Sequence, residues 1–169
     1  KVTNGISTTT ILAYDALGRV LASQQSTGGK TYNLRYTYDL SGALTSETYP
    51  SGRQITTQYD GVGRASKVTG ALGGVQSTYM GWVSYAPQGA VAAMQMGNNL
   101  WQVYSYNSRL QLQRIEDAVN NDPSQVLFDQ HFEWGTTNNN GNLQSVVTNH
   151  GGPGYPQSLL TLKEYYGYD

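Results

Sequence analysis

The chain has 169 residues, the size of one domain, and a formal net charge of −1 at pH 7. Lys, Arg, Asp and Glu make up 12% of it, and the cations are scattered, which excludes bulk electrostatic attraction to nucleic acid. No apolar run approaches the ~20 residues of a membrane-spanning helix, and the absence of cysteine excludes disulfides. The 14 tyrosines and 20 glycines favour strands with many turns.

The pattern Tyr-Asp-x-x-Gly recurs along the chain, in two copies with an Arg directly after the Gly. Such repetition is typical of an array of small structural units. It predicts that function depends on the assembled surface rather than on one catalytic cluster. The complete copies are Tyr14, Asp15, Gly18 and Arg19, then Tyr38, Asp39 and Gly42, then Tyr59, Asp60, Gly63 and Arg64.

Looser copies continue the series. Tyr85 is followed by Ala and later Gly89, Tyr106 is followed by Asn107, Trp134 precedes Gly135, and the last copy stops at Tyr168-Asp169. We call the residues at positions 14, 38, 59, 85, 106, 134 and 168 the marker aromatics; they are 21 to 34 residues apart. The spacing predicts a single repeat array over residues 1–169, with about six to seven repeats that become degenerate after about residue 110.

Alternating residues before each marker aromatic predict a strand. In residues 32–38, Tyr32, Leu34, Tyr36 and Tyr38 share one face and polar residues share the other. We therefore expect each marker aromatic to end a strand on its buried face.

The rest of each motif predicts a turn. Asp after the Tyr can accept backbone N–H bonds, and Gly three residues later allows a positive φ, as in a four- or five-residue hairpin loop. A second class of Gly- or Asn-rich turns falls between the markers, and the longest loops are expected at 138–142 and 150–156. Together these signals predict an all-β chain of about twelve to fourteen strands and no helix. The turns of the second class lie at residues 28–29, 50–52, 73–74, 97–99, 120–123 and 151–152.

The motifs at Tyr14–Val20 and Tyr59–Arg64 resemble the Rhs/YD-repeat family. The resemblance is strongest from residue 11 to 70 and weak beyond 110. It implies a strip of successive antiparallel β-hairpins that forms a segment of a spiral or open barrel. Relatives in this family include bacterial Rhs toxins, the cocoon-forming subunits of insecticidal toxin complexes and the animal teneurins. Such shells are much longer than this chain, which could supply only an arc of one or a short open spiral.

The resemblance has one clear departure. Family toxins close the shell with a segment that contains Asp-Pro-x-Gly and an aspartyl self-cleavage element. In this chain, Asp122-Pro123-Ser124-Gln125 lacks the Gly and lies mid-chain, so no protease residues are carried over. We expect no cofactor and no metal.

The acidic residues have two interpretations. Asp15, Asp39 and Asp60 could be metal or catalytic carboxylates, but turn formation explains them fully. His131 and Glu133 share a strand face without an evident third ligand, so a polar stripe opposite Phe132 and Trp134 is favoured over a metal site. Glu116, Asp117 and Asp129 offer acids but no defined glycosidase pair. We therefore expect no enzyme activity.

The aromatic residues also have two interpretations. Trp82, Trp101 and the tyrosines could stack on sugars, or they could form the hydrophobic layer of the sheet, which is favoured. Trp101 has the opposite phase to Tyr104 and Tyr106, so we expect it to be the exposed binding aromatic.

Three functions remain open at this point. The first is a non-catalytic repeat segment of a secreted or cell-surface bacterial protein that forms shell wall or scaffold. The second is a self-assembling β protein whose copies complete each other's edge strands, because open sheets expose such edges. The third is a surface module that binds glycans or another protein.

Overall fold

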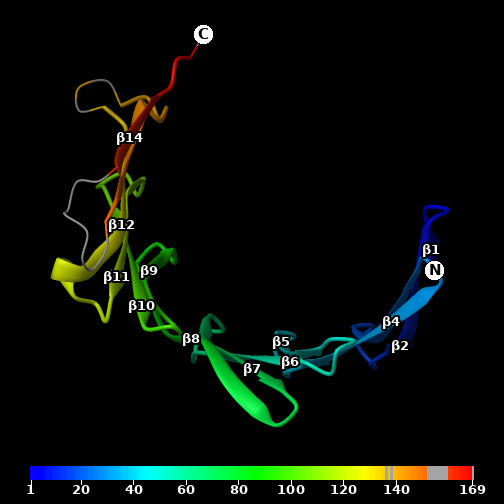
Figure 1. The fold of residues 1–169 in the computed structure, drawn as a ribbon. Coiled ribbons are helices and arrows are strands. Elements are labelled where there is room, and N and C mark those ends of the chain that lie inside the picture. The colour runs from blue at the N-terminus through cyan, green and yellow to red at the C-terminus, as the bar shows by residue number, and fades with distance from the viewer. Residues whose placement is uncertain (136, 138, 152–159, 169) are drawn as a thin grey trace. The chain divides into compact units, whose positions relative to one another are not determined.

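The structure, a computed structural model, describes residues 1–135, 137, 139–151 and 160–168 (Figure 1). These residues divide into two compact units, Lys1–Tyr79 and Met80–Asp169. Across the described residues the order of the fourteen strands is the order of the chain. The prediction of an all-β chain of successive antiparallel hairpins is confirmed. No helix of the described residues has the length and apolar character needed to cross a membrane.

The first unit is a run of antiparallel hairpins, coloured blue to green in Figure 1. Each strand pairs with its neighbour in the chain, as in the register of Thr37 with Ser46 and of Glu47 with Ile55. Its strands are β1 (Val2–Thr3), β2 (Ser7–Tyr14), β3 (Val20–Thr27), β4 (Lys30–Tyr38), β5 (Leu44–Thr48), β6 (Gln54–Tyr59), β7 (Ala65–Leu72) and the beginning of β8 (Val75–Tyr85).

The second unit continues the same topology from Met80. A three-residue 3₁₀-helix, η1 (Pro123–Gln125), precedes β12, and it is the one departure from the expected absence of helix among the described residues. The unit contains the end of β8, β9 (Val91–Met96), β10 (Leu100–Tyr106), β11 (Leu112–Val119), β12 (Val126–Glu133), β13 (Ser145–His150) and β14 (Leu160–Tyr165).

Two-residue turns close several hairpins on the side away from the markers. At Gly28-Gly29 both φ angles are positive, 54° and 74°, and Thr27 pairs directly with Lys30. Two consecutive positive φ angles match the right-handed twist of the flanking strands, and glycine adopts them without a Cβ clash. Gly73 and Gly74, between β7 and β8, also have positive φ, 59° and 83°. Asn120 and Asn121 have positive φ as well, 53° and 59°, but they begin a longer connection that includes η1.

Burial in both units is shallow. Ala118 and Val146 are the buried hydrophobic residues of the described part, and Tyr14 remains 58% exposed. Strands β2, β4, β6, β8 and β10 do end at marker aromatics. The expectation that every marker aromatic ends a strand on its buried face is wrong for Tyr14 and Tyr168, which are both 58% exposed, and β12 and β14 end before Trp134 and Tyr168. Within the described residues, strands make extensive contacts only with their chain neighbours, so no second layer covers these rings.

Some predicted features fall outside the described residues. The loop expected at 138–142 includes residue 138, the loop at 150–156 and the turn at 151–152 extend into 152–159, and the last motif includes Asp169.

Candidate functional site

The first marker turn is built around the carboxylate of Asp15. One oxygen, Oδ1, accepts the backbone N–H groups of Leu17 and Arg19, both at 2.9 Å. The other, Oδ2, accepts the Nε–H of the Arg19 side chain at 2.6 Å. The backbone N–H of Arg19 is the largest influence that holds the pKa of Asp15 below its ordinary value, against the opposing effect of burial. The acid is thus fully engaged in the turn.

The next two turns repeat this arrangement. Asp60 accepts the backbone N–H of Arg64 at 2.9 Å and its Nε–H at 2.8 Å. Asp39, which has Ala43 where the other turns have Arg, accepts the Ala43 N–H at 2.9 Å and the Ser41 hydroxyl at 2.7 Å. The Ser41 hydroxyl contributes most to lowering the pKa of Asp39, and the Arg64 N–H does so for Asp60.

The Asn107 turn preserves the geometry with a neutral side chain. Its Oδ1 accepts the N–H groups of Arg109 and Gln111 at 2.9 and 3.0 Å. Leu110 occupies the glycine position with φ of 64°, a left-handed conformation that is strained for a residue with a Cβ. A degenerate sequence therefore still folds into the marker turn.

Glycine completes the regular turns. The N–H of Gly18 donates to the Asp15 carbonyl at 3.1 Å, and Gly63 does the same to Asp60 at 3.0 Å. Gly18, Gly42 and Gly63 have φ of 80°, 97° and 82°. A positive-φ glycine after a tight turn is the arrangement of a G1 β-bulge. The register shifts directly before Tyr14, Tyr38, Tyr59, Tyr85 and Tyr106.

The side chains of the marker aromatics connect successive repeats. The Tyr59 hydroxyl, at the end of β6, donates to the carbonyl of Leu44 at the start of β5, 2.8 Å away. The same bond recurs with an indole donor, because Trp134 Nε1 donates to the Leu112 carbonyl at 2.7 Å. We call these bonds the aromatic clamps. The others join Tyr38 to Val20 (3.0 Å), Tyr106 to Val91 (2.8 Å) and Tyr168 to Leu143 (2.9 Å).

Arginine adds a second link between turns. Arg19 Nη1 donates to the Asp39 carbonyl at 2.9 Å, and its guanidinium lies 4.8 Å from the centre of the Tyr38 ring. In the second unit, Arg109 donates in the same way to the Asn139 carbonyl. Arg19 thus holds its own turn through Asp15 and the next turn through Asp39.

One turn of this type was not predicted. The Tyr49 N–H donates to the Arg53 carbonyl at 2.8 Å, and the Gly52 N–H donates to the Tyr49 carbonyl at 2.9 Å, which is the backbone pattern of the marker turns. The sequence places Pro50, Ser51 and Gly52 in the second class of turns. Tyr49 takes the position of the motif Asp in this turn, and the available signal was Gly52-Arg53, which matches Gly18-Arg19.

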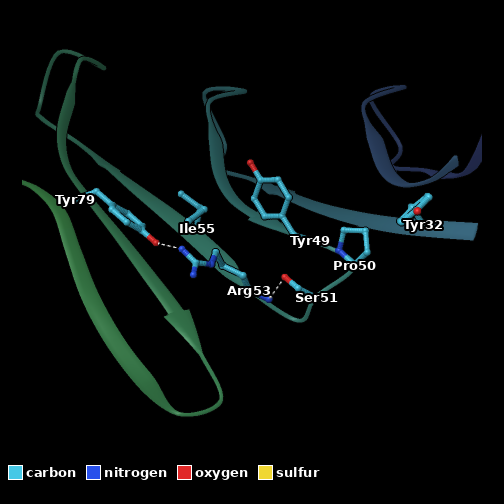
Figure 2. Close-up of a pocket in the computed structure, with 7 residues that line it drawn as sticks. All are labelled: Tyr32, Tyr49, Pro50, Ser51, Arg53, Ile55 and Tyr79. Carbon is cyan, nitrogen blue, oxygen red and sulfur yellow. Dashed lines mark hydrogen bonds between the residues drawn. The ribbon is translucent and has the colours of Figure 1, made fainter.

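A groove follows this turn (Figure 2). It has a volume of about 590 Å³ and is lined by residues of β4, β6, β8 and the Tyr49 turn, all within the first unit. The Arg53 guanidinium donates to the hydroxyl of Tyr79, whose ring covers Gly70. The lining residues are Tyr32, Tyr49, Pro50, Ser51, Arg53, Ile55 and Tyr79.

The tryptophan pair lies in the second unit. The rings of Trp82 and Trp101 are 5.3 Å apart at an angle of 46°. Trp82 is 44% exposed, whereas Trp101 is only half-buried, in register with Ala118 on β11. The expectation of Trp101 as the exposed aromatic therefore needs correction: its ring lies against the Trp82 ring, and Trp82 is the more exposed member.

The remaining acids take part in local networks. Asp129 accepts Arg114 Nε–H at 2.6 Å and pairs with His131 at 2.9 Å, and Arg114 also contacts Glu116. Burial raises the pKa of Asp129, but the bonds from Arg114 and His131 outweigh it and leave that pKa below its ordinary value. No group of three metal-ligating side chains occurs in the described part of the chain.

The Asp122-Pro123 segment is also structural. Asp122 caps η1 by accepting the Ser124 N–H and hydroxyl at 2.9 and 2.7 Å and the Gln125 amide at 2.9 Å. The Ser124 hydroxyl is the largest influence that lowers the pKa of Asp122. This is the role of a helix cap.

The RHS Repeat family model matches residues 14–54 and 38–75, which contain the three complete motifs. Residues 14–75 of this chain therefore match the RHS repeat. No match was found among curated proteins.

Solved structures show the same fold for almost the whole of this chain. The crystal structure of TcdB2-TccC3-Cdc42 aligns with a TM-score of 0.81 over 97% of this chain and 9% of that one, at 20% identity. A structure of the Photorhabdus luminescens Tc holotoxin pore aligns with a TM-score of 0.74 over 85% of this chain and 8% of that one, at 22% identity. This chain therefore spans less than a tenth of the length of these structures.

Proposed function

We propose that residues 1–169 form a single array of YD repeats that serves as a wall or scaffold segment of a larger exported bacterial protein. The aromatic clamps support this most directly, because each of them joins one repeat to the preceding one. In the marker turns, Asp15, Asp39 and Asp60 and the glycines after them have a complete structural role. We propose that the segment has no catalytic activity and no cofactor.

The shallow burial of the chain supports a place in something larger. Ala118 and Val146 are the buried hydrophobic residues of the described part. Small domains are stable when they bury enough apolar surface, and an array gains stability by adding neighbouring repeats. The aligned Tc structures, in which this fold is a small part of a long chain, agree with this role.

The experiment is to identify the native protein in the producing organism. Mass spectrometry of the culture supernatant and cell surface should detect peptides of residues 1–169 within a polypeptide several times longer, in the exported fraction. A mature cytoplasmic protein that consists of these residues alone would overturn the proposal. Replacing Asp15, Asp39 and Asp60 together with Ala should reduce secretion of the long protein through misfolding, whereas Glu133→Gln should leave secretion unchanged.

Edge pairing offers a second mode of assembly for the same repeats. β1 and β14 are the end strands of the described order, and each pairs with one neighbour there. Unpaired strand edges can pair with another chain. The partner would then be another copy rather than the rest of a longer chain. Light scattering distinguishes the two: concentration-dependent growth of the 169-residue chain supports copies as partners, and a constant monomer mass argues against them.

A further inference from the structure

We propose that a free edge of β8 pairs with the same edge of a second copy of the chain, as antiparallel strands related by a two-fold axis at Ser77. The edge consists of residues Val75–Tyr79, which lie in the first unit and take no part in the marker turns or the aromatic clamps. It lies in the middle of the strand order, so this pairing is independent of the scaffold role and of the end strands β1 and β14.

The first half of β8 lacks a strand on one side. β9 pairs with β8 from Met80 onward, where Met80 lies opposite Met96, the last residue of β9. Residues Val75–Tyr79 therefore have β7 on one side and, among the described residues, no strand on the other. All five are exposed, Val75 to 70%. This part of β8 thus offers unpaired backbone N–H and C=O groups within an otherwise continuous sheet.

The residues of this edge permit pairing rather than prevent it. Native proteins protect edge strands with charged side chains, proline or bulges. A comparable open edge exists at Lys30–Leu34, because β5 pairs with β4 only from Arg35 onward, and there Lys30 supplies an exposed charge. Residues Val75–Tyr79 contain neither a charge nor a proline, and no charged side chain occurs from residue 68 to residue 108. Two copies would therefore meet at β8 without repulsion between like charges.

The largest side chain of the segment leaves the edge clear. The Tyr79 ring lies over Gly70 of β7, on the side away from the open edge, where an added Cβ would be 2.5 Å from Tyr79 Cε2. Arg53 donates to the Tyr79 hydroxyl and holds the ring in this position. The backbone of the edge is therefore accessible to a second strand, and the ring loses little conformational freedom when that strand arrives.

The sequence of the edge is complementary to itself. With the axis at Ser77, Val75 lies opposite Tyr79 of the second copy, and Gln76 lies opposite its Thr78. A β-branched residue opposite an aromatic one stabilises an antiparallel sheet, and the polar pair lies on the other face. A shift by one residue would place Val75 opposite Thr78 and lose both matches, so the register at Ser77 is favoured.

The size of the contact limits its strength. Five residues on each side form an interface smaller than the standard size of about 1,600 Å², so we expect a reversible dimer rather than a permanent one. A two-fold contact uses the same edge on both copies and is complete once two chains have met. The mass should therefore level off at two chains, whereas head-to-tail pairing of β1 with β14 would continue to add chains.

Analytical ultracentrifugation of the 169-residue chain tests the stoichiometry. The mass should rise with concentration and level off at two chains. Thr78→Lys places a charge on the edge and should weaken association about tenfold or more. Asn33→Lys adds the same charge to the open edge of β4 and is the matched control, which should associate like the parent. A monomer at every concentration, growth beyond two chains, or equal weakening by both substitutions would each overturn the proposal.

A single cysteine tests the register. The chain contains no cysteine, so Ser77→Cys can form a disulfide only between two copies. On the two-fold axis the two Cα atoms would be about 4.5–5.5 Å apart, within the range that a disulfide spans. Val75→Cys lies on the same face but about 14 Å from its counterpart, which is too far. With a mild oxidant, which takes one electron and one proton from each thiol, Ser77→Cys should form covalent dimers about tenfold faster than Val75→Cys or more. Equal rates for the two variants, or no covalent dimer of Ser77→Cys, would contradict the two-fold pairing.

Discussion

In a marker turn, a single side-chain oxygen accepts two backbone N–H groups. Asp60 Oδ1 accepts the N–H groups of Val62 and Arg64, and Asn107 Oδ1 accepts the equivalent N–H groups in its own turn. An amide is therefore sufficient to form the turn. The second carboxylate oxygen of Asp60 serves the Arg64 side chain instead, so the acid is needed only where an arginine follows the glycine.

This distinction predicts a change in acid sensitivity for Asp60→Asn. Hydrogen bonds lower the pKa of Asp60 in the folded chain, relative to about 3.9 when unfolded. The resulting stabilisation is present above the unfolded pKa and is lost as the pH falls through the folded pKa. Asp60→Asn should be slightly less stable at pH 7, where the ion pair between Asp60 and Arg64 is lost, but should lose less stability than the parent between about pH 5 and pH 2.

Urea unfolding at a series of pH values measures this effect. Glu133→Gln is the control, because Glu133 is exposed and forms no ion pair within the described residues. If the free energy of unfolding varied with pH in the same way for the parent and Asp60→Asn, Asp60 would not contribute to the loss of stability in acid.

The glycine positions give a second prediction at this scale. At Gly63, φ is 82° and nothing lies within 4 Å of an added Cβ, so Gly63→Ala should cost about 1 kcal/mol from backbone strain alone. Leu110→Gly should be stabilising or neutral, because it relieves the same strain at φ of 64°. Denaturant midpoints measure both. A Gly63→Ala variant as stable as the parent would show that the turn can rearrange.

At the scale of an element, the aromatic clamp explains why an aromatic with a polar tip ends so many strands. Tyr59 reaches from the end of β6 to the start of β5, so one hydroxyl ties together the two strands that meet at that edge. Trp134 does the same with an N–H. A phenylalanine would pack similarly but could not donate, which agrees with the chain having 14 tyrosines and only 2 phenylalanines.

Removing the hydroxyl alone tests the clamp. Tyr59→Phe should lower the free energy of unfolding by about 0.5–1.5 kcal/mol, the range for one net hydrogen bond. Tyr14→Phe is the matched control, since no hydrogen bond of the Tyr14 hydroxyl occurs in the described structure and its side chain is 58% exposed. Thermal and urea unfolding of both variants measure the difference. Equal stability of the two variants would show that the clamp hydrogen bond does not stabilise the fold.

The strands and turns could be predicted from the sequence, whereas the contacts between repeats could not. Alternation and turn chemistry are local properties of the sequence. They were therefore sufficient to predict the strands that end at Tyr38 and Tyr59 and the Asp-to-Gly turns that follow them. The carbonyl that each tyrosine binds lies 15 or 18 residues earlier and depends on the register between repeats, which a single motif does not encode. The position of Tyr79 over Gly70, and hence the groove, likewise depends on how β7 and β8 pair across their turn.

At the scale of the whole molecule, stability should be local. Strands make extensive contacts only with their neighbours in the chain, and few side chains are buried. In such arrays the free energy is approximately a sum of repeat terms and nearest-neighbour terms, so a perturbation spreads little beyond adjacent repeats. In a protein with one compact core, the same perturbation would instead destabilise every element that packs against that core.

Hydrogen exchange on a matched pair of variants distinguishes these cases. Tyr59→Phe, which breaks the bond to Leu44, should speed amide exchange in β5, β6 and β7 and leave β12 and β13 unchanged. Trp134→Phe, which breaks the bond to Leu112, should instead speed amide exchange in β11, β12 and β13 and leave β5 and β6 unchanged. If either variant accelerates exchange to the same extent along the whole chain, the array unfolds as one cooperative unit and the nearest-neighbour description is wrong. A local response instead would explain how the motif can degenerate in one repeat without destroying the others, because each clamp stabilises only the strands that it joins.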